Sequence, residues 1–235
     1  MSEIAARLAA LRERIETAAK RAGRDPRELT LIGVAKKHGA EAVAEAVAAG
    51  VHDIGENFAQ EAREKIPLVH ELLAARGIEP PRWHFLGQLQ RNKARLVVPL
   101  FDCVQTVDRL DLAQELSRRA QAAGKRLAVT LQVNVDAEPQ KGGCEPGELR
   151  ALLDAVRALP SLEVRGLMAI PEPVADMRPA FARLRTLRDE LSRVSGAECS
   201  MLSMGMSDDF ESAIAEGATH VRIGTALFGS RGATQ

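Results

Sequence analysis

The chain alternates between short apolar runs and longer amphipathic segments. In the first ~20 residues, apolar side chains recur at helical spacing, which predicts an amphipathic helix that ends before "GRDP". Eight later runs rich in apolar or β-branched residues predict strands at 29–34, 51–56, 83–87, 103–107, 126–135, 163–170, 198–205 and 219–229. Between them, segments rich in Ala, Leu, Glu and Arg predict helices at 40–49, 58–75, 109–123, 146–158 and 177–195.

This regular alternation predicts a parallel sheet with helices outside it. Eight strand–helix units in 235 residues are typical of a (β/α)₈ TIM barrel, here with an additional N-terminal helix. An open doubly wound sheet is the alternative, but no Gly-x-Gly-x-x-Gly turn follows the first strand. No linker or change in composition divides the chain, so we expect a single α/β domain over residues 1–235.

Composition excludes several classes of protein. Lys plus Arg equal Asp plus Glu at 32 each, and zero net charge argues against a nucleic-acid binder. The one basic run, 91–95, is expected to begin a solvated helix. Cys103, Cys144 and Cys199 are widely spaced and odd in number, which indicates neither a disulfide framework nor a metal site. No apolar run approaches the roughly 18 residues of a membrane span, so we expect a cytoplasmic protein.

The first predicted strand ends on two lysines. In a barrel, residues that directly follow the strands face one shared mouth. A lysine that is partly desolvated there has a lowered pKa and can attack a carbonyl to form a Schiff base. Side chains alternate across a strand, so Lys36 faces the interior if Ile32 and Val34 do. Lys37 is the alternative nucleophile, and a solvated lysine at the start of a loop is the alternative without function.

A candidate phosphate site lies near the other end of the sequence. The loops after strands seven and eight of such barrels commonly bind phosphate. Here Gly205 and Gly224 would allow close backbone approach, and the hydroxyls of Ser207 and Thr225 could donate to an anion. We expect a helix to begin near Ser207. Each of these residues alone is more often an ordinary turn glycine or helix cap.

The neighbours of these loop residues complete the expectation. Met204 and Met206 flank the turn glycine and are expected to line the mouth, although methionine also fills gaps in cores. Asp208 and Asp209 would repel a phosphate, so the hypothesis requires both carboxylates to point away from it.

A Schiff-base lysine and a phosphate site together suit a ligand with an aldehyde and a phosphate, such as pyridoxal 5′-phosphate (PLP). The sequence also resembles the PLP-binding homeostasis proteins, whose fold is similar to the N-terminal barrel of alanine racemase. The resemblance extends over nearly the whole chain. It rests on these blocks, in order: "GVAKK", "IGENFAQE", "WHFLGQLQRNK", "VNVDAEPQKGG", "GLMAI", "LSMGMSDDFESAI" and "VRIGTALFG".

The resemblance implies a role for each matching residue. The implied cofactor contacts are Lys36 as the Schiff base, Asn57 beside the ring, Arg222 at the pyridine nitrogen, and Ser207, Gly224 and Thr225 around the phosphate. A guanidinium can only donate, so the pyridine nitrogen must accept and stay unprotonated. Such a ring is a weaker electron sink.

Other residues fit a structural role at least as well. Trp83, the one tryptophan, is expected to pack, and His84 to be a hydrogen-bonded core or rim residue. Lys141 could be a second aldehyde trap or a loop charge, and we do not place it in the site.

Three functions remain to be compared. A PLP-dependent racemase needs two bases, and in barrel racemases the second is a tyrosine from an added domain. This chain contains no tyrosine and ends soon after strand eight. A Schiff-base enzyme acting on a phosphorylated substrate would need an acid or base, for which Glu56, Asp136 and His84 are candidates without evident partners.

The third function is the one that the resemblance implies. It is PLP and amino-acid homeostasis without substantial racemase activity, with transfer of the cofactor to apo-enzymes as a further possibility. We therefore expect no catalytic residue, and we expect a monomer.

Overall fold

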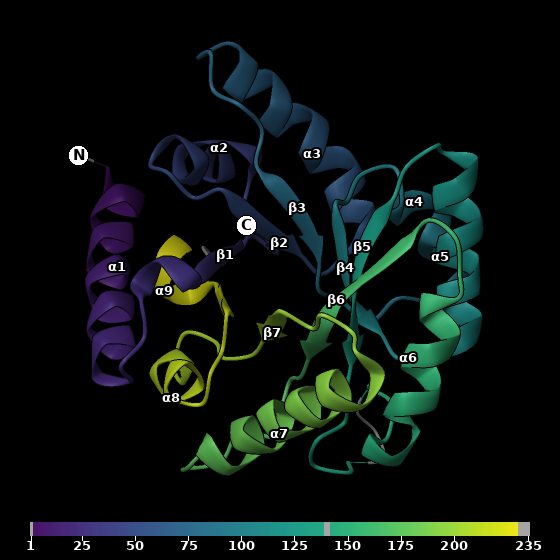
Figure 1. The fold of residues 1–235 in the computed structure, drawn as a ribbon. Helices are drawn as coiled ribbons and strands as arrows, with labels where there is room; N and C mark the ends of the chain where they lie inside the picture. Colours follow the sequence, from purple (N-terminus) through teal and green to yellow (C-terminus); the bar gives the residue numbers. More distant parts are fainter. Residues whose placement is uncertain (1, 139–141, 230–235) are drawn as a thin grey trace.

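The computed structural model describes residues 2–138 and 142–229 and forms a closed barrel of parallel strands (Figure 1). Lys141 lies outside the described residues. Each strand pairs with the next along the chain, and β1 pairs with β8 to close the barrel. The strands are β1 (Thr30–Val34), β2 (Asp53–Glu56), β3 (Arg82–Phe85), β4 (Cys103–Val107), β5 (Leu127–Gln132), β6 (Leu162–Met168), β7 (Met201–Ser203) and β8 (His220–Ile223). The predicted TIM barrel is confirmed.

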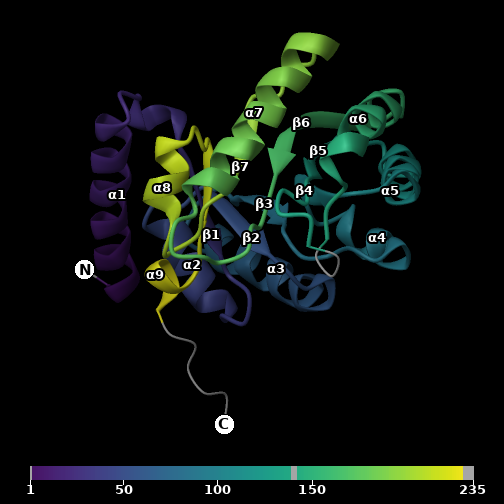
Figure 2. The same ribbon diagram turned by 90° about the horizontal axis from the view of Figure 1, so that it is seen from below.

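Helices surround the barrel. They are α1 (Glu3–Arg21), α2 (Ala40–Ala48), α3 (Ala59–Ala74), α4 (Ala94–Val97), α5 (Leu110–Ala122), α6 (Leu149–Arg157), α7 (Arg178–Ser195), α8 (Phe210–Ala215) and α9 (Thr225–Phe228), with 3₁₀ turns η1 (Pro26–Glu28), η2 (Arg91–Lys93) and η3 (Pro146–Glu148). The predicted N-terminal helix is α1, which begins where the Ser2 hydroxyl accepts the N–H of Ala5. Its apolar face packs against α8 and α9 (Figure 2).

Several element boundaries near the C-terminal end of the chain differ from the prediction, among them those of the seventh strand, which spans Met201–Ser203 rather than 198–205. The last strand, predicted over 219–229, ends at Ile223, because its ladder with β1 ends there and the chain turns into α9, which buries Leu227 and Phe228. The helix expected near Ser207 begins at Phe210, because a turn precedes it.

The sheet separates two unlike environments. On its outer side, strands and helices share one large hydrophobic cluster that includes Val221 and Ile223 of β8. Arg222 lies between these two residues, so alternation directs its side chain into the barrel. Inside the barrel, Ile32 and Val34 form a separate small apolar cluster with Leu86. The premise for an inward-facing Lys36 is therefore met.

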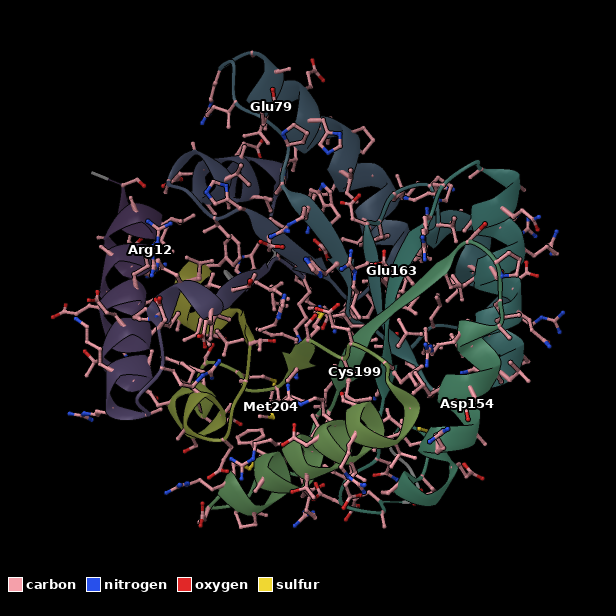
Figure 3. All side chains as sticks on the ribbon, viewed as in Figure 1. Arg12, Glu79, Asp154, Glu163, Cys199 and Met204 are labelled. Atoms are coloured by element: carbon pink, nitrogen blue, oxygen red, sulfur yellow. The ribbon has the colours of Figure 1, made fainter. Side chains whose placement is uncertain are left out.

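Within residues 2–138 and 142–229, no helix has the length and apolar character needed to cross a bilayer. The same residues contain no group of His, Cys, Asp and Glu suited to a metal ion. Cys103, Cys144 and Cys199 are buried free thiols, and burial raises the pKa of Cys103 to about 12. In Figure 3, Cys199 lies within the fold, whereas the charged side chains of Glu79 and Asp154 project from its edge.

Candidate functional site

A cavity of about 270 Å³ lies at the C-terminal ends of the strands. Its lining brings together seven of the eight predicted cofactor-binding residues, which are Lys36, Asn57, Met206, Ser207, Arg222, Gly224 and Thr225. Because β1 pairs with β8, the lysine after β1 and the glycine after β8 lie on adjacent strands. The topology alone thus brings the two ends of the sequence to one site.

Two other cavities are larger than the one at the candidate site. A cavity of about 430 Å³ lies between α1 and the N-terminal ends of β1–β3, and one of about 680 Å³ lies between α1 and α8. Chemistry in such barrels belongs to the opposite, C-terminal face. We therefore assign the site to the smaller cavity, because of its lining and its position.

Helix α3 holds the turn that carries Lys36. The carbonyl of Ala35 accepts from Lys65 Nζ at 2.8 Å, and the backbone N–H of Lys37 donates to Glu61 Oε1 at 2.6 Å. Lys37 has φ +64°, a left-handed conformation that ends the strand sharply. Lys36 lines the cavity while Lys37 is exposed, which is the orientation that strand alternation predicts.

The side chains of α3 that hold this turn belong to a buried ion cluster, which the sequence analysis did not predict. Lys65 Nζ lies 2.6 Å from Glu56 Oε1 and 2.6 Å from Glu61 Oε1. Burial raises the pKa of Glu56 to about 7, and it outweighs the opposing effect of Lys65. The available signal was the four-residue spacing of Glu61 and Lys65 on one helix face. Glu56, considered above as an acid or base, instead faces α3.

Close backbone packing holds Asn57 in the lining. A Cβ at Gly87 would lie 1.9 Å from the carbonyl oxygen of Asn57, so only glycine allows the loop after β3 to approach it. The Oδ1 atom of Asn57 is buried and has no hydrogen-bond partner among the described residues. The cavity therefore contains an acceptor that a donor of a ligand would satisfy.

The loops after β7 and β8 are joined to each other. The N–H of Arg222 donates to the carbonyl of Gly205 at 3.0 Å, and the N–H of Ala226 donates to Ser207 Oγ at 3.4 Å. Gly205 has φ +89°, and a Cβ there would lie 2.6 Å from the Cβ of Ala213. The predicted phosphate loops therefore form one unit.

Three neighbours of these loops behave differently from one another. Asp209 accepts the N–H of Met206, as a cap of the turn before α8. Asp208 lines the cavity, contrary to the expectation that it points away. Met204, also expected in the lining, is fully buried in the outer hydrophobic cluster, because Ser203 before it faces the barrel interior and side chains alternate along the strand. Only Met206 reaches the cavity.

Arg222 is the buried cation of the site. Its Nη1 donates to Ser203 Oγ at 2.8 Å and its Nη2 to the carbonyl of Ala169 at 2.9 Å. Among the described residues it forms no ion pair with a carboxylate. Burial lowers the pKa of Arg222 to about 10, which still leaves it charged at neutral pH. The cavity thus presents a donor whose charge no direct partner neutralises.

The remaining candidates have structural partners. His84 is buried and hydrogen-bonded at both ring nitrogens, and Trp83 Nε1 donates to His70 Nε2 at 3.1 Å. Both are core residues, as expected. Asp136 pairs with Arg183 and does not line the cavity.

Comparison with known proteins places this site in a family. The chain matches the family model of the alanine racemase N-terminal domain over residues 6–232. It is 50% identical over 234 residues to the pyridoxal phosphate homeostasis protein of Pseudomonas aeruginosa, covering 98% of this chain and 97% of that one. The chain belongs to the pyridoxal phosphate homeostasis protein family. The resemblance inferred from the sequence blocks is confirmed.

A second relative and a solved structure extend the comparison. The Escherichia coli protein of that name is 44% identical over 241 residues, covering 98% of each chain. The structure of PipY from Synechococcus elongatus with PLP bound superposes with a TM-score of 0.82, at 39% identity over 97% of this chain and all of that chain. Both comparisons extend over nearly the whole of this chain.

Proposed function

We propose that this protein binds PLP in the cavity at the C-terminal ends of the strands, holds it as a Schiff base on Lys36, and serves intracellular PLP and amino-acid homeostasis. One observation carries the proposal. Lys36, Ser207, Thr225 and the buried Arg222 all line one cavity of small-molecule size. The name of the Pseudomonas aeruginosa relative and the PLP bound to PipY support it.

The residues present fit the chemistry of PLP. Ser207, Gly224 and Thr225 would hold the phosphate, and Arg222 would donate to the ring nitrogen. Asn57 Oδ1 offers a buried acceptor that needs a donor. When bound, PLP supplies an electrophilic aldehyde and an electron-withdrawing ring.

The charged donor at the ring nitrogen makes this a weak electron sink. The guanidinium of Arg222 can donate a hydrogen bond but cannot accept one, so it favours an unprotonated ring nitrogen. The chain also has no tyrosine to act as the second base of a racemase. We therefore propose a carrier or buffer of PLP, without substantial racemase activity, rather than a catalyst.

The proposal extends to the setting of the protein. Residues 1–235 would act as a single PLP-binding domain, as a monomer in the cytoplasm. Its cellular function would be to transfer PLP to apo-enzymes. That idea predicts that PLP reaches an added apo-enzyme faster than it dissociates freely from this protein, and equal rates would reduce the role to storage.

The deciding experiment uses PLP, borohydride reduction and peptide mapping. Wild type should develop a visible absorbance band, and reduction should fix the adduct to Lys36. Lys36→Ala should lose both, and Lys37→Ala, the matched control on the exposed neighbour, should keep both. No band in wild type would overturn the cofactor proposal. An adduct on Lys37 in wild type would overturn the assignment of the nucleophile.

A further inference from the structure

A chain of buried side chains crosses the barrel interior and ends at Arg222. After the Arg222–Ser203 bond, Ser203 Oγ donates to Gln105 Oε1 at 2.7 Å. Gln105 Nε2 lies 3.0 Å from His84 Nδ1, and His84 Nε2 lies 2.9 Å from Asp53 Oδ1. The five residues come from β8, β7, β4, β3 and β2, and all are buried. The chain therefore connects the cavity with the opposite end of the barrel.

The two ends of this hydrogen-bond chain and the orientation of the Gln105 amide together set the direction of every bond. Arg222 can only donate, and the carboxylate of Asp53 can only accept. Gln105 accepts from Ser203 through Oε1 and places its NH₂ at His84 Nδ1, so Nδ1 accepts and His84 donates from Nε2 to Asp53. The amide oxygen is then free to accept from Ser203, and the lone pair of Ser203 to accept from Arg222. All four bonds donate in the same sense.

Rotation of the Gln105 amide would leave groups unpaired. Ser203 Oγ could accept from the rotated NH₂, but its hydroxyl proton would lose its acceptor, and the amide oxygen would face Nδ1 of His84, which carries no proton in this arrangement. Buried polar groups without partners are costly, which favours the orientation in which Ser203 donates to Gln105 and accepts from Arg222.

A neutral partner has a consequence that a carboxylate would not have. Asp53 is the one carboxylate among the five residues of the hydrogen-bond chain, and it lies at the end far from the cavity. There Arg82 Nη2 pairs with its other oxygen at 2.9 Å. At the near end, Ser203 and the carbonyl of Ala169 orient the guanidinium but bring no negative charge to it. Arg222 is thus fixed in direction by neutral groups, and the carboxylate of Asp209 acts on its charge only through space, with no hydrogen bond or ion pair between the two among the described residues.

We infer that Ser203 and Gln105 are positioning residues that aim the guanidinium of Arg222 at the acceptor of the bound ligand. The inference rests on the proposed function, in which that acceptor is the pyridine nitrogen of PLP. Neither residue lines the cavity, so each acts through Arg222 rather than by touching the ligand.

The test compares PLP with its carbocyclic analogue, in which a C–H replaces the ring nitrogen. Both ligands keep the aldehyde and the phosphate, so the ratio of their dissociation constants reports on the contact at the ring nitrogen alone. Wild type should prefer PLP. Ser203→Ala should reduce that preference by roughly ten- to hundredfold, as expected for a lost bond to a charged group. Gln105→Met, nearly isosteric, should reduce it by roughly two- to fivefold.

Thr130→Val is the matched control. Thr130 is also buried in the barrel, and its hydroxyl donates to the backbone carbonyl of Gln105 at 2.9 Å, outside the chain. It should lower stability and leave the preference unchanged. An unchanged preference in folded Ser203→Ala and Gln105→Met would overturn the inference. An equal loss in Thr130→Val would also overturn it, because it would indicate general loosening of the barrel.

This experiment separates the two proposals. If wild type binds neither ligand, or binds them without an adduct on Lys36, the proposed function fails first. If wild type forms the adduct and prefers PLP while the variants keep that preference, only the positioning role fails. Should Ser203→Ala not fold, the Gln105→Met measurement still decides.

Discussion

The two sides of the barrel sheet are built on different principles. Between sheet and helices, side chains from every strand join one continuous hydrophobic cluster. Inside the barrel, apolar contacts shrink to a cluster of three residues beside the hydrogen-bond chain from Asp53 to Arg222. Apolar burial has no direction, and many combinations of side chains satisfy it. The outer layer therefore supplies stability, while the interior supplies orientation.

Barrel interiors of this type are commonly filled by branched apolar side chains in layers. A polar interior is costly unless each group is paired, which the one-way chain achieves. The outer layer contains a comparable polar device, the cluster of Lys65 with Glu56 and Glu61. It lies directly behind the turn of Lys36. These two groups of buried polar side chains, one on each side of the sheet, both hold a residue of the site.

The largest effect should follow from a cavity in the outer layer. Phe101 is fully buried and packs edge-to-face on Phe85, with ring centroids 5.3 Å apart. Phe101→Ala should lower the free energy of unfolding in urea by about 3–5 kcal/mol. The folded variant should still prefer PLP over the carbocyclic analogue as wild type does. A changed preference would contradict the division between the two sides.

A smaller effect, confined to the mouth, should follow from Gly87→Ala. The new methyl group would displace the backbone of Asn57, because its Cβ would lie 1.9 Å from that carbonyl oxygen. We expect PLP binding, measured by absorbance titration, to weaken by about 1–3 kcal/mol. Gly147→Ala is the control, because a Cβ there meets no atom within 4 Å. Equal effects of the two substitutions would show that the close approach is not needed.

The buried cluster of the outer layer should make stability depend on pH. Glu56 has its pKa raised from 4.5 to about 7 in the folded protein, so the folded state binds more protons than the unfolded state between these values. Its stabilising contribution is therefore full below about pH 4.5 and is lost as the pH rises through about 7. Glu56→Gln should flatten the fall in unfolding free energy between about pH 5 and 8, measured by urea denaturation.

Glu115 provides the opposite case as a control. Hydrogen bonds from Arg118 and Arg119 lower the pKa of Glu115 to about 2, so its contribution is present above 4.5 and is lost only as the pH falls toward 2. Glu115→Gln should leave the slope between pH 5 and 8 unchanged. If it flattens that slope as Glu56→Gln does, the assignment to the buried carboxyl is wrong.

The smallest effect should come from Asp208, which lines the cavity but is exposed. Its carboxylate opposes a phosphate, and solvent weakens that repulsion. Asp208→Asn should tighten PLP binding by roughly two- to fivefold at low salt, and by less at high salt. Asp154→Asn, on the outer helix α6, should change nothing. Weaker binding in Asp208→Asn would indicate that the carboxylate holds the loop rather than repels the ligand.

Local patterns were enough to predict the barrel and most of its mouth. The outward residues of the strands are apolar because they pack against the helices. The alternation of strands and helices could therefore be read from the sequence even where the inward residues are polar. Lys36 could be placed because it directly follows a strand. Met204 could not, because its outward direction follows from the inward direction of Ser203, whose contacts with Gln105 and Arg222 form only in the closed barrel. Helix α9 is only four residues long and depends on packing that no local signal records.

The interior chain lay beyond prediction for another reason. Ser203 and Gln105 are 98 residues apart, and nothing in either neighbourhood identifies the other as its partner. Only the closed barrel, with its particular register, brings them together. Directional contacts between distant strands are a property of the assembled sheet.

Closure of the barrel between β1 and β8 also shapes how the protein is made. Thr30 pairs with His220, which the ribosome adds roughly 190 residues and about 10–40 s later. During that interval the nascent chain carries an open strand edge, and α1 lacks the helices α8 and α9 that cover its apolar face. Arg222 and Gly224 are also synthesised late. Lys36 is therefore synthesised long before the other residues of its pocket, which is complete only when synthesis is almost finished.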